Sequence, residues 1–292
     1  MKQTASLALI GGDLRQAVLA GQFAADGHTV AVCALERHEF PAGVASFARP
    51  EQCPAGVQAV ILPMPVLRDE LHLNAPLANA ALPVSRVLDA LPPGMLVLGG
   101  AVPDPVRRRA ERAQLRIIDY LQREELAIRN AVPTAEGAIQ LAMEELPVTI
   151  QGLRALVIGN GRIGRAVAGR LACLGADVTV SARRPEDFAR IESACWHALD
   201  TRRLDGHLAG FELVVNTVPA PVLGAAGLAE LPPDCLILDL ASKPGGIDFD
   251  AASALGRHAV WALSLPGKVA PVSAARALRD TIYTILQEEA IL

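Results

Sequence analysis

Short runs of apolar residues alternate along this chain with longer segments whose apolar positions recur at helical spacing. In the first half the predicted strands are Leu7–Ile10, Thr29–Cys33, Val57–Leu62, Met95–Leu98 and Arg116–Asp119. The helical pattern covers Leu14–Ala25, which Gly27 closes, and Pro105–Gln114. Strands that alternate with helices predict a parallel sheet joined by crossover helices.

The same alternation resumes in the second half. The predicted strands there are residues 153–158, Asp177–Val180, Leu213–Val215, Cys235–Leu238 and Ala259–Leu263, and the clearest helix is Arg165–Leu174. A helical pattern over Pro133–Glu145 precedes these strands, with Pro133 suited to its first turn and Pro147 as its stop. The last segment, Val272–Ile291, is also helical and follows all the strands.

These patterns predict an α/β protein of two doubly wound, parallel-sheet (Rossmann-like) domains separated by a cleft. The length of 292 residues is sufficient for two domains of ordinary size. We expect residues 1–146 plus 271–292 to form the substrate, or catalytic, domain, because the last helix can return to pack on it. Residues 147–270 form the predicted NADP-binding domain. Ligands should lie in the cleft, beyond the carboxyl ends of the strands.

A glycine-rich turn follows the first strand of the second domain. Residues Gly159, Asn160, Gly161, Arg162, Ile163 and Gly164 form a G-x-G-x-x-G pattern between this strand and a helix. Gly159 permits a tight turn, Gly161 lets the backbone approach a phosphate, and Gly164 lets helix and strand pack closely. The helix amides then face the anion. The pattern predicts a dinucleotide site, and a glycine turn without phosphate is the alternative.

The end of the next strand indicates which dinucleotide binds. An acidic residue commonly accepts the ribose 2′-hydroxyl of NAD about 20 residues after the first glycine. This chain has Ser181-Ala182-Arg183-Arg184 there, and two guanidiniums with a hydroxyl suit the 2′-phosphate of NADP. Arginines in a solvated turn are the alternative. The loop after Leu213–Val215 is expected to lie along the nicotinamide ribose: Asn216, Thr217, Val218 and Pro219.

Composition excludes several classes of protein. A net charge of −4 and a pI near 5.9 argue against nucleic-acid binding. No apolar run reaches the ~18 residues of a membrane span, and no signal peptide is evident. The five cysteines are scattered, as in a reduced cytoplasmic protein. The six histidines show no metal-binding spacing, so no metal is expected.

Polar residues that follow the first-domain strands are candidates for substrate chemistry. Arg15 lies in the first helical turn after Gly11-Gly12-Asp13, where a small carboxylate could bind, although Asp13 as a plain N-cap explains the turn equally. Arg123 could clamp a carboxylate, and Asp119 or Glu124 could accept a proton. A solvated helix start is the alternative for that segment.

Two further groups complete the candidates. Asn130 and Thr134 open the predicted linking helix and would face the cleft, unless they only cap that helix. Lys243 and Lys268 are two of three lysines in an arginine-rich chain, and each lies in a Gly/Pro loop. A compact ammonium at these loops could bind an anion, and chance placement is the alternative.

Five motifs together resemble the A-subunit family of dipicolinate synthase. They are GGDLRQ at 11–16, the segment Tyr120–Gln140, VIGNGRIG at 157–164, DLASKPGG at 239–246 and LPGKVAP at 265–271. The resemblance spans nearly the whole chain in the same order, except for Arg37–Pro54. The segment Tyr120–Gln140 is its most specific part, because many dehydrogenases share the glycine fingerprint.

The resemblance implies a function. Members of this family oxidise dihydrodipicolinate to dipicolinate, a pyridine dicarboxylate, with reduction of NADP. They work with the flavoprotein-like B-subunit of the same enzyme in the mother cell of a sporulating bacterium. Arg15, Arg123, Lys243 and Lys268 would then hold the carboxylates, and Asp119 or Glu124 would take the proton. The layout is also similar to that of D-2-hydroxyacid dehydrogenases, but their catalytic His–Glu pair has no evident counterpart.

Two alternatives remain open at this point. The chain could be another two-domain NADP enzyme of the shikimate or hydroxy-acid type. It could instead be a nucleotide-binding regulatory subunit whose partner performs the chemistry. Assembly into a homo-oligomer is compatible with either reading.

Overall fold

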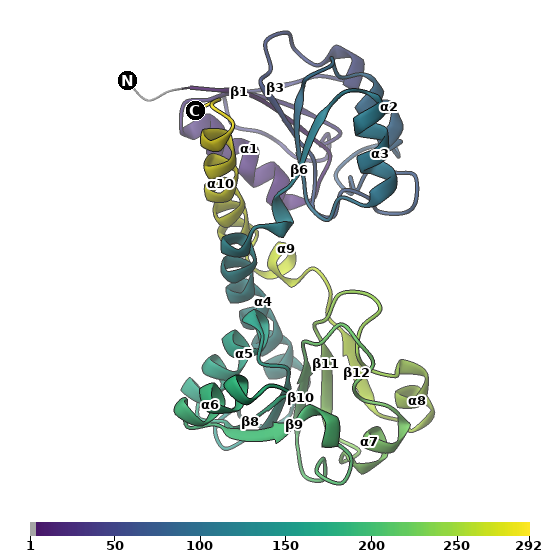
Figure 1. The fold of residues 1–292 in the computed structure, drawn as a ribbon, viewed down its shortest axis with the longest axis vertical. Helices are drawn as coiled ribbons and strands as arrows, with labels where there is room; N and C mark the ends of the chain where they lie inside the picture. Colours follow the sequence, from purple (N-terminus) through teal and green to yellow (C-terminus); the bar gives the residue numbers. More distant parts are fainter. Residues whose placement is uncertain (1–3) are drawn as a thin grey trace. The chain divides into compact units, whose positions relative to one another are not determined.

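The computed structural model describes residues 4–292 and divides into two units (Figure 1). One unit contains the chain up to Arg129 together with Ala270–Leu292, and the other contains Asn130–Val269. Each unit is built around one six-stranded sheet whose paired strands all run parallel. The α/β, Rossmann-like fold class is therefore confirmed for each unit.

The first unit has the strand order β3-β2-β1-β4-β5-β6. Its strands are β1 (Ser6–Ile10), β2 (Thr29–Cys33), β3 (Val44–Ser46), β4 (Ala59–Ile61), β5 (Leu96–Gly99) and β6 (Arg116–Asp119). Its helices are α1 (Leu14–Ala25), α2 (Val84–Asp89), α3 (Asp104–Arg112) and α10 (Pro271–Glu288), with single 3-10 turns at Pro50–Gln52 and Tyr120–Gln122.

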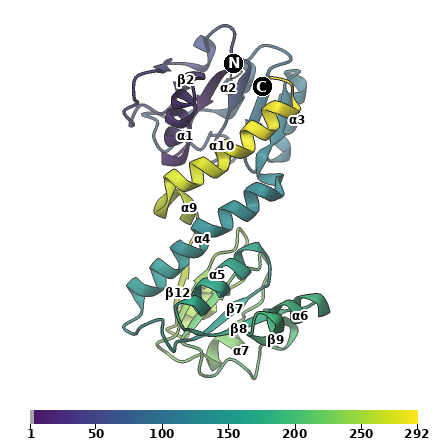
Figure 2. The same ribbon diagram turned by 90° about the vertical axis from the view of Figure 1, so that its left-hand side faces the viewer.

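Alternating side chains of β1 supply two separate cores. Leu7 and Leu9 pack with the apolar faces of α1 and α10, whereas Ala8 and Ile10 pack on the opposite side with α2 and α3. Helices α1 and α10 lie side by side in both views (Figures 1 and 2). The chain's last helix therefore covers one face of the first unit's sheet.

The second unit has the order β12-β11-β10-β7-β8-β9. Its strands are β7 (Arg154–Ile158), β8 (Asp177–Ala182), β9 (His197–Asp200), β10 (Leu213–Asn216), β11 (Leu236–Asp239) and β12 (His258–Trp261). Its helices are α5 (Arg162–Cys173), α6 (Pro185–Ser193), α7 (Ala225–Glu230), α8 (Phe249–Ala254) and α9 (Leu265–Val269), with a 3-10 turn at Thr201–Arg203. Numbered from its own first strand, the order matches that of the first unit. The two sheets thus share one topology.

Helix α4 (Glu124–Glu145) differs from the sequence prediction. The prediction that this helix starts at Pro133 is wrong, because Pro133 lies inside it. A proline has no N–H, so the carbonyl of Arg129 lacks its usual helical partner. Burial keeps the helix intact on both sides of that gap: Leu126 belongs to a core of the first unit, and Ala135 to a core of the second.

Other differences concern short elements. The sequence pattern does not predict strands β3 and β9 or helices α2, α6, α7 and α8, and Lys268 lies in the short helix α9 rather than in a loop. Among residues 4–292 no helix is long and apolar enough to cross a membrane. Within the same residues, no group of three or more His, Cys, Asp or Glu side chains is arranged to hold a metal ion.

Candidate dinucleotide-binding site

The glycine turn between β7 and α5 has the geometry that each of its glycines predicts. Gly159 has a φ of +101°, and a Cβ there would lie 2.7 Å from Thr217 Oγ1. A Cβ on Gly164 would lie 1.9 Å from the carbonyl oxygen of Gly159, so only glycine lets α5 pack this close to β7. At Gly161 a Cβ would meet nothing within 4 Å. Of these three glycines, Gly161 is therefore the one whose backbone is open to a ligand, as the G-x-G-x-x-G pattern predicts.

The start of α5 is suited to an anion. Gly161 is the N-cap residue and provides no side-chain cap for the first-turn amides. Such amides lack helical partners and lie at the positive end of the helix dipole. The turn therefore fits a pyrophosphate, in agreement with the space above Gly161.

Asn160 adds an unsatisfied polar atom to this turn. Its side chain is 8% exposed, and its Nδ2 lies 3.4 Å from the carbonyl oxygen of Asp187. Its Oδ1 is buried and has no hydrogen-bond partner within the described part of the chain. Because a buried acceptor without a partner is costly, this oxygen is suited to receive a donor from a bound ligand.

A hollow of about 430 Å³ joins the glycine turn to the end of β8. Its walls are residues 159–161, 182–184 and 217–219, with Asp187 and Thr201. Eight of the thirteen predicted cofactor residues thus line a single hollow: Gly159, Asn160, Gly161, Arg183, Arg184, Thr217, Val218 and Pro219.

The two arginines at the end of β8 differ in their availability. The side chain of Arg184 donates to Asp187 at 2.7 Å, and this hydrogen bond raises the pKa of Arg184. Arg183 is exposed and forms no hydrogen bond or ion pair with any residue of 4–292. Arg183 is therefore the guanidinium that can receive an additional phosphate without losing a partner.

Ser181 and Asn216 lie beneath this hollow rather than on its surface. Ser181 is fully buried, and its Oγ accepts a hydrogen bond from Thr201 Oγ1 at 3.0 Å. Asn216 is also fully buried, and its Nδ2 donates to Asp239 at 2.8 Å and to the carbonyl of Val218 at 3.0 Å. Both side chains fix the ends of strands, and they orient the residues that do line the hollow.

Asp239 organises the loop that carries Lys243. Its buried carboxylate accepts hydrogen bonds from the backbone of Ala241 at 3.0 Å and of Gly246 at 2.8 Å, besides the one from Asn216. Ile247 donates at a longer 3.3 Å. Lys243 is exposed on this anchored loop. Asp239 is absent from the residues predicted by sequence, although an aspartate that ends an apolar strand before a Gly/Pro loop signals this role.

Two predicted carboxylate-binding arginines of the first unit are paired internally. Arg15 is 7% exposed, donates to Asp13 at 2.7 Å and reaches the carbonyl of Met64 at 2.8 Å. Arg123 forms an ion pair with Glu288, which raises the pKa of Arg123 and lowers that of Glu288. Each guanidinium would have to share its donors with a substrate.

The predicted proton acceptors are placed differently. Asp119 accepts from the backbone of Ala101 at 3.0 Å, Val102 at 2.9 Å and Leu121 at 3.0 Å, so both its oxygens tie the ends of β5 and β6 together. Glu124 is exposed in the first turn of α4.

The remaining candidates lie on α4 and α9. Thr134 Oγ1 donates to the carbonyl of Asn130 at 2.7 Å, and the buried Oδ1 of Asn130 has no partner within residues 4–292. Lys268 is exposed near the end of α9.

The fold and the open glycine turn define a protein of the Rossmann-like dehydrogenase architecture. The transhydrogenase from Sinorhizobium meliloti has a similar fold, with a TM-score of 0.73 over 98% of this chain and 95% of that one. Its sequence identity is 16%, so this likeness concerns the fold alone.

Closer relatives identify the family. Residues 6–121 match the N-terminal domain of the dipicolinate synthase A-subunit. The dipicolinate synthase A-subunit of Bacillus subtilis (strain 168) is 32% identical over 287 residues, which cover 97% of this chain and 96% of that protein. The crystal structure of the corresponding protein from Bacillus halodurans gives a TM-score of 0.88 at 30% identity, with 97% of each chain covered. The chain belongs to the A-subunit family of dipicolinate synthase.

Proposed function

We propose that this chain oxidises dihydrodipicolinate to dipicolinate with NADP. The observation that carries the proposal is the open glycine turn with the unpaired Arg183 beside it, in a chain of this family. Bound NADP would supply a hydride acceptor: oxidation of the dihydropyridine ring removes one hydride and one proton, and the ring becomes aromatic. Aromatisation favours this step, so the chain's main task is to position the ring.

The second unit provides the residues that would hold NADP. The first-turn amides of α5 and the space above Gly161 receive the pyrophosphate. Arg183 forms a charge-assisted pair with the 2′-phosphate, with Arg184 beside it. Asp187 is already bonded to Arg184 and Arg190, which makes it a poor acceptor for the free ribose hydroxyl of NAD. This arrangement supports NADP over NAD.

Substrate binding rests on groups that attract a dicarboxylate. Lys243 and Lys268 are exposed ammoniums with no ion-pair partner among the described residues. We assign them to the two carboxylates, together with Arg15, Arg123, Asn130 and Thr134. For the proton, Asp119 and Glu124 are the two proposed acceptors. The three backbone N–H groups that donate hydrogen bonds to Asp119 also give it a positioning role.

The proposal extends to the division of the chain and to its biological setting, and membership of the family supports the latter. We propose that residues 1–146 with 271–292 form the substrate part and residues 147–270 the NADP-binding part. We also propose that the chain works in the cytoplasm of the mother cell of a sporulating bacterium. Its proposed partner there is the flavoprotein-like B-subunit of the same enzyme.

The test of cofactor choice is a titration of the purified chain with NADP and NAD. A charge-assisted hydrogen bond contributes about 1.5–3 kcal/mol, so Arg183→Ala should weaken NADP binding about 10- to 100-fold and leave NAD binding unchanged. The exposed Arg108→Ala in the first unit is the matched control. Equal weakening of NADP and NAD by Arg183→Ala would exclude a 2′-phosphate contact.

Turnover is tested by adding dihydrodipicolinate to the chain with NADP and following the absorbance of the reduced nicotinamide. Formation of NADPH by this chain alone supports the proposed activity. Absence of turnover until the flavoprotein-like partner is added, with NADP binding intact, would instead favour a regulatory role for this chain.

A further inference from the structure

A second hollow lies in the first unit, at the carboxyl ends of β2 and β3. Its volume is about 700 Å³, larger than that of the hollow beside the glycine turn of the second unit. Three segments form its walls: residues 32–36 with His38 and Phe40, residues 46–50, and residues 78–82 with Arg86. None of the predicted substrate or cofactor residues lines it.

The position of this hollow has a counterpart in the second unit. Both sheets have the same strand order, so β1, β2 and β3 correspond to β7, β8 and β9. The candidate dinucleotide hollow includes Arg183 and Arg184 at the end of β8 and Thr201 after β9. The first-unit hollow lies at the corresponding strand ends, where this topology binds the adenosine half of a dinucleotide.

At the glycine turn of the first unit, however, the side chains of Leu73 and Gln16 lie against Gly11 and Gly12, and an acidic residue stands at the helix start. A Cβ on Gly12 would lie 2.3 Å from Gln16 Cβ, and one on Gly11 would lie 2.5 Å from Leu73 Cδ2. Gln16 is 2% exposed and donates to the carbonyl of Ile61 at 2.9 Å, so it cannot move aside cheaply. Asp13 also places a carboxylate at this helix start. A ligand of this hollow therefore carries no pyrophosphate.

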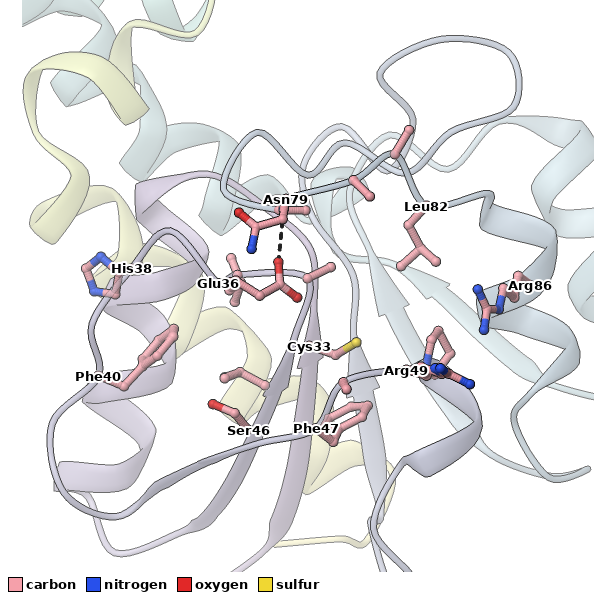
Figure 3. A pocket seen from close by; sticks show the side chains of 18 residues that line it. Cys33, Glu36, His38, Phe40, Ser46, Phe47, Arg49, Asn79, Leu82 and Arg86 are labelled. Atoms are coloured by element: carbon pink, nitrogen blue, oxygen red, sulfur yellow. Dashed lines mark hydrogen bonds between the residues drawn. The ribbon is translucent and has the colours of Figure 1, made fainter.

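Glu36 has the position of the acidic residue that binds ribose in such folds. It lies three residues beyond β2 and 25 residues after Gly11, close to the spacing of about 20 expected for a ribose acceptor. One of its oxygens accepts from the backbone of Asn79 at 3.1 Å, and its other oxygen has no hydrogen-bond partner among the described residues (Figure 3). That oxygen is available to a diol.

The other walls suit an uncharged aromatic ring. Phe40, Phe47 and Leu82 provide apolar surface, and Arg49 lies on the opposite side from Phe40 (Figure 3). Arg49 is exposed and has no ion-pair partner within residues 4–292, so its guanidinium can stack on a base.

The charges around the hollow nearly balance. Arg86 is paired with Glu51 at 2.6 Å, and Glu36 offsets Arg49. Burial, with the charge of Glu36, raises the pKa of the Cys33 thiol to about 11, so Cys33 adds no charge. The balance favours a neutral ligand over a polyanion.

We propose that this hollow binds a neutral purine ribonucleoside, with the base between Phe47, Leu82 and Arg49 and the ribose diol on Glu36. This site is separate from the proposed NADP site and does not depend on it. It gives the first unit a nucleoside-binding role of its own.

Calorimetric titration of the full chain with adenosine, in saturating NADP, tests the proposal. We expect saturable binding that Glu36→Gln weakens at least tenfold, and weaker binding of 2′-deoxyadenosine to the unchanged chain. Glu39→Gln is the matched control, because Glu39 is an exposed neighbour that does not line the hollow. Arg49→Ala should also weaken adenosine binding.

Two results would overturn the proposal. One is the absence of adenosine binding while NADP still binds. The other is adenosine binding that Glu36→Gln leaves intact, or that is seen without NADP and is abolished by excess NADP, which would assign adenosine to another site such as the dinucleotide hollow. Failure of NADP binding with adenosine binding retained would instead count against the proposed function alone.

Discussion

Replacing Gly164 and Gly161 by alanine, one at a time, tests the packing of α5 and the binding of the ligand independently. In Gly164→Ala the new methyl would lie 1.9 Å from the carbonyl oxygen of Gly159, more than 1 Å inside a normal contact. The neighbour is backbone and cannot rotate away, so α5 must shift. In Gly161→Ala the methyl meets no atom within 4 Å, and the φ of −78° suits alanine. The fold should tolerate that change.

The magnitudes follow from these distances. Forcing an extra methyl into a packed interior costs about 1–3 kcal/mol, and the backbone contact places Gly164→Ala near 3 kcal/mol. For a unit of about 140 residues, this corresponds to a fall in Tm of about 6–12 °C. Gly161→Ala costs about 0.5–1 kcal/mol through the loss of a favourable N-cap residue. Its methyl, however, occupies the space proposed for the pyrophosphate, so NADP affinity should fall at least tenfold.

Thermal unfolding followed by circular dichroism, with NADP titration of each variant at 25 °C, distinguishes these effects. We expect a large loss of Tm for Gly164→Ala, and a large loss of NADP affinity with nearly unchanged Tm for Gly161→Ala. Full NADP affinity in Gly161→Ala would show that the pyrophosphate does not approach this glycine. Equal Tm values for the two variants would refute the packing argument.

Three further predictions concern two buried carboxylates and one exposed lysine. Asp239→Asn should lower the free energy of unfolding by about 1–3 kcal/mol for each backbone donor left without an acceptor, measured by urea unfolding against the exposed control Asp234→Asn. The Arg184 hydrogen bond lowers the pKa of Asp187, so this carboxylate stabilises the fold above about pH 4 and loses that effect as pH falls. The stability gap between the unchanged chain and Asp187→Asn should therefore shrink below pH 4, and a gap that is constant with pH would contradict the pairing. Lys268→Ala should raise KM for dihydrodipicolinate, and unchanged KM and kcat would remove Lys268 from the substrate site.

Local sequence signals predict much of the fold. The bounds of α1, β2 and β6 agree with the structure, because a clear apolar period and flanking Gly or Asp residues mark each of them. The sequence pattern does not predict strands β3 and β9, because they are only three and four residues long and lie at the edges of their sheets. Their partly exposed residues give no alternation to detect.

The environment of a candidate side chain is less predictable where it depends on a partner residue far away in the sequence. The glycine spacing specifies the turn, because its requirements are local. No spacing could show that Arg123 pairs with Glu288, which lies 165 residues away, or that Ser181 is turned inward to meet Thr201. The start of α4 is wrongly predicted at Pro133 for the same reason. Packing of α4 on both sides of Pro133 overrides the usual preference of proline for a helix start.

The return of α10 to the first unit has a consequence for biosynthesis. Ile282, Ile285 and Leu286 complete the core on one side of a sheet whose strands are all made within the first 119 residues. During translation that core remains incomplete until α10 leaves the ribosome, whereas residues 130–269 form a continuous unit that emerges earlier. We therefore expect the first unit to complete its fold after the second, against the usual N-terminal-first order, with an apolar face exposed until α10 is made.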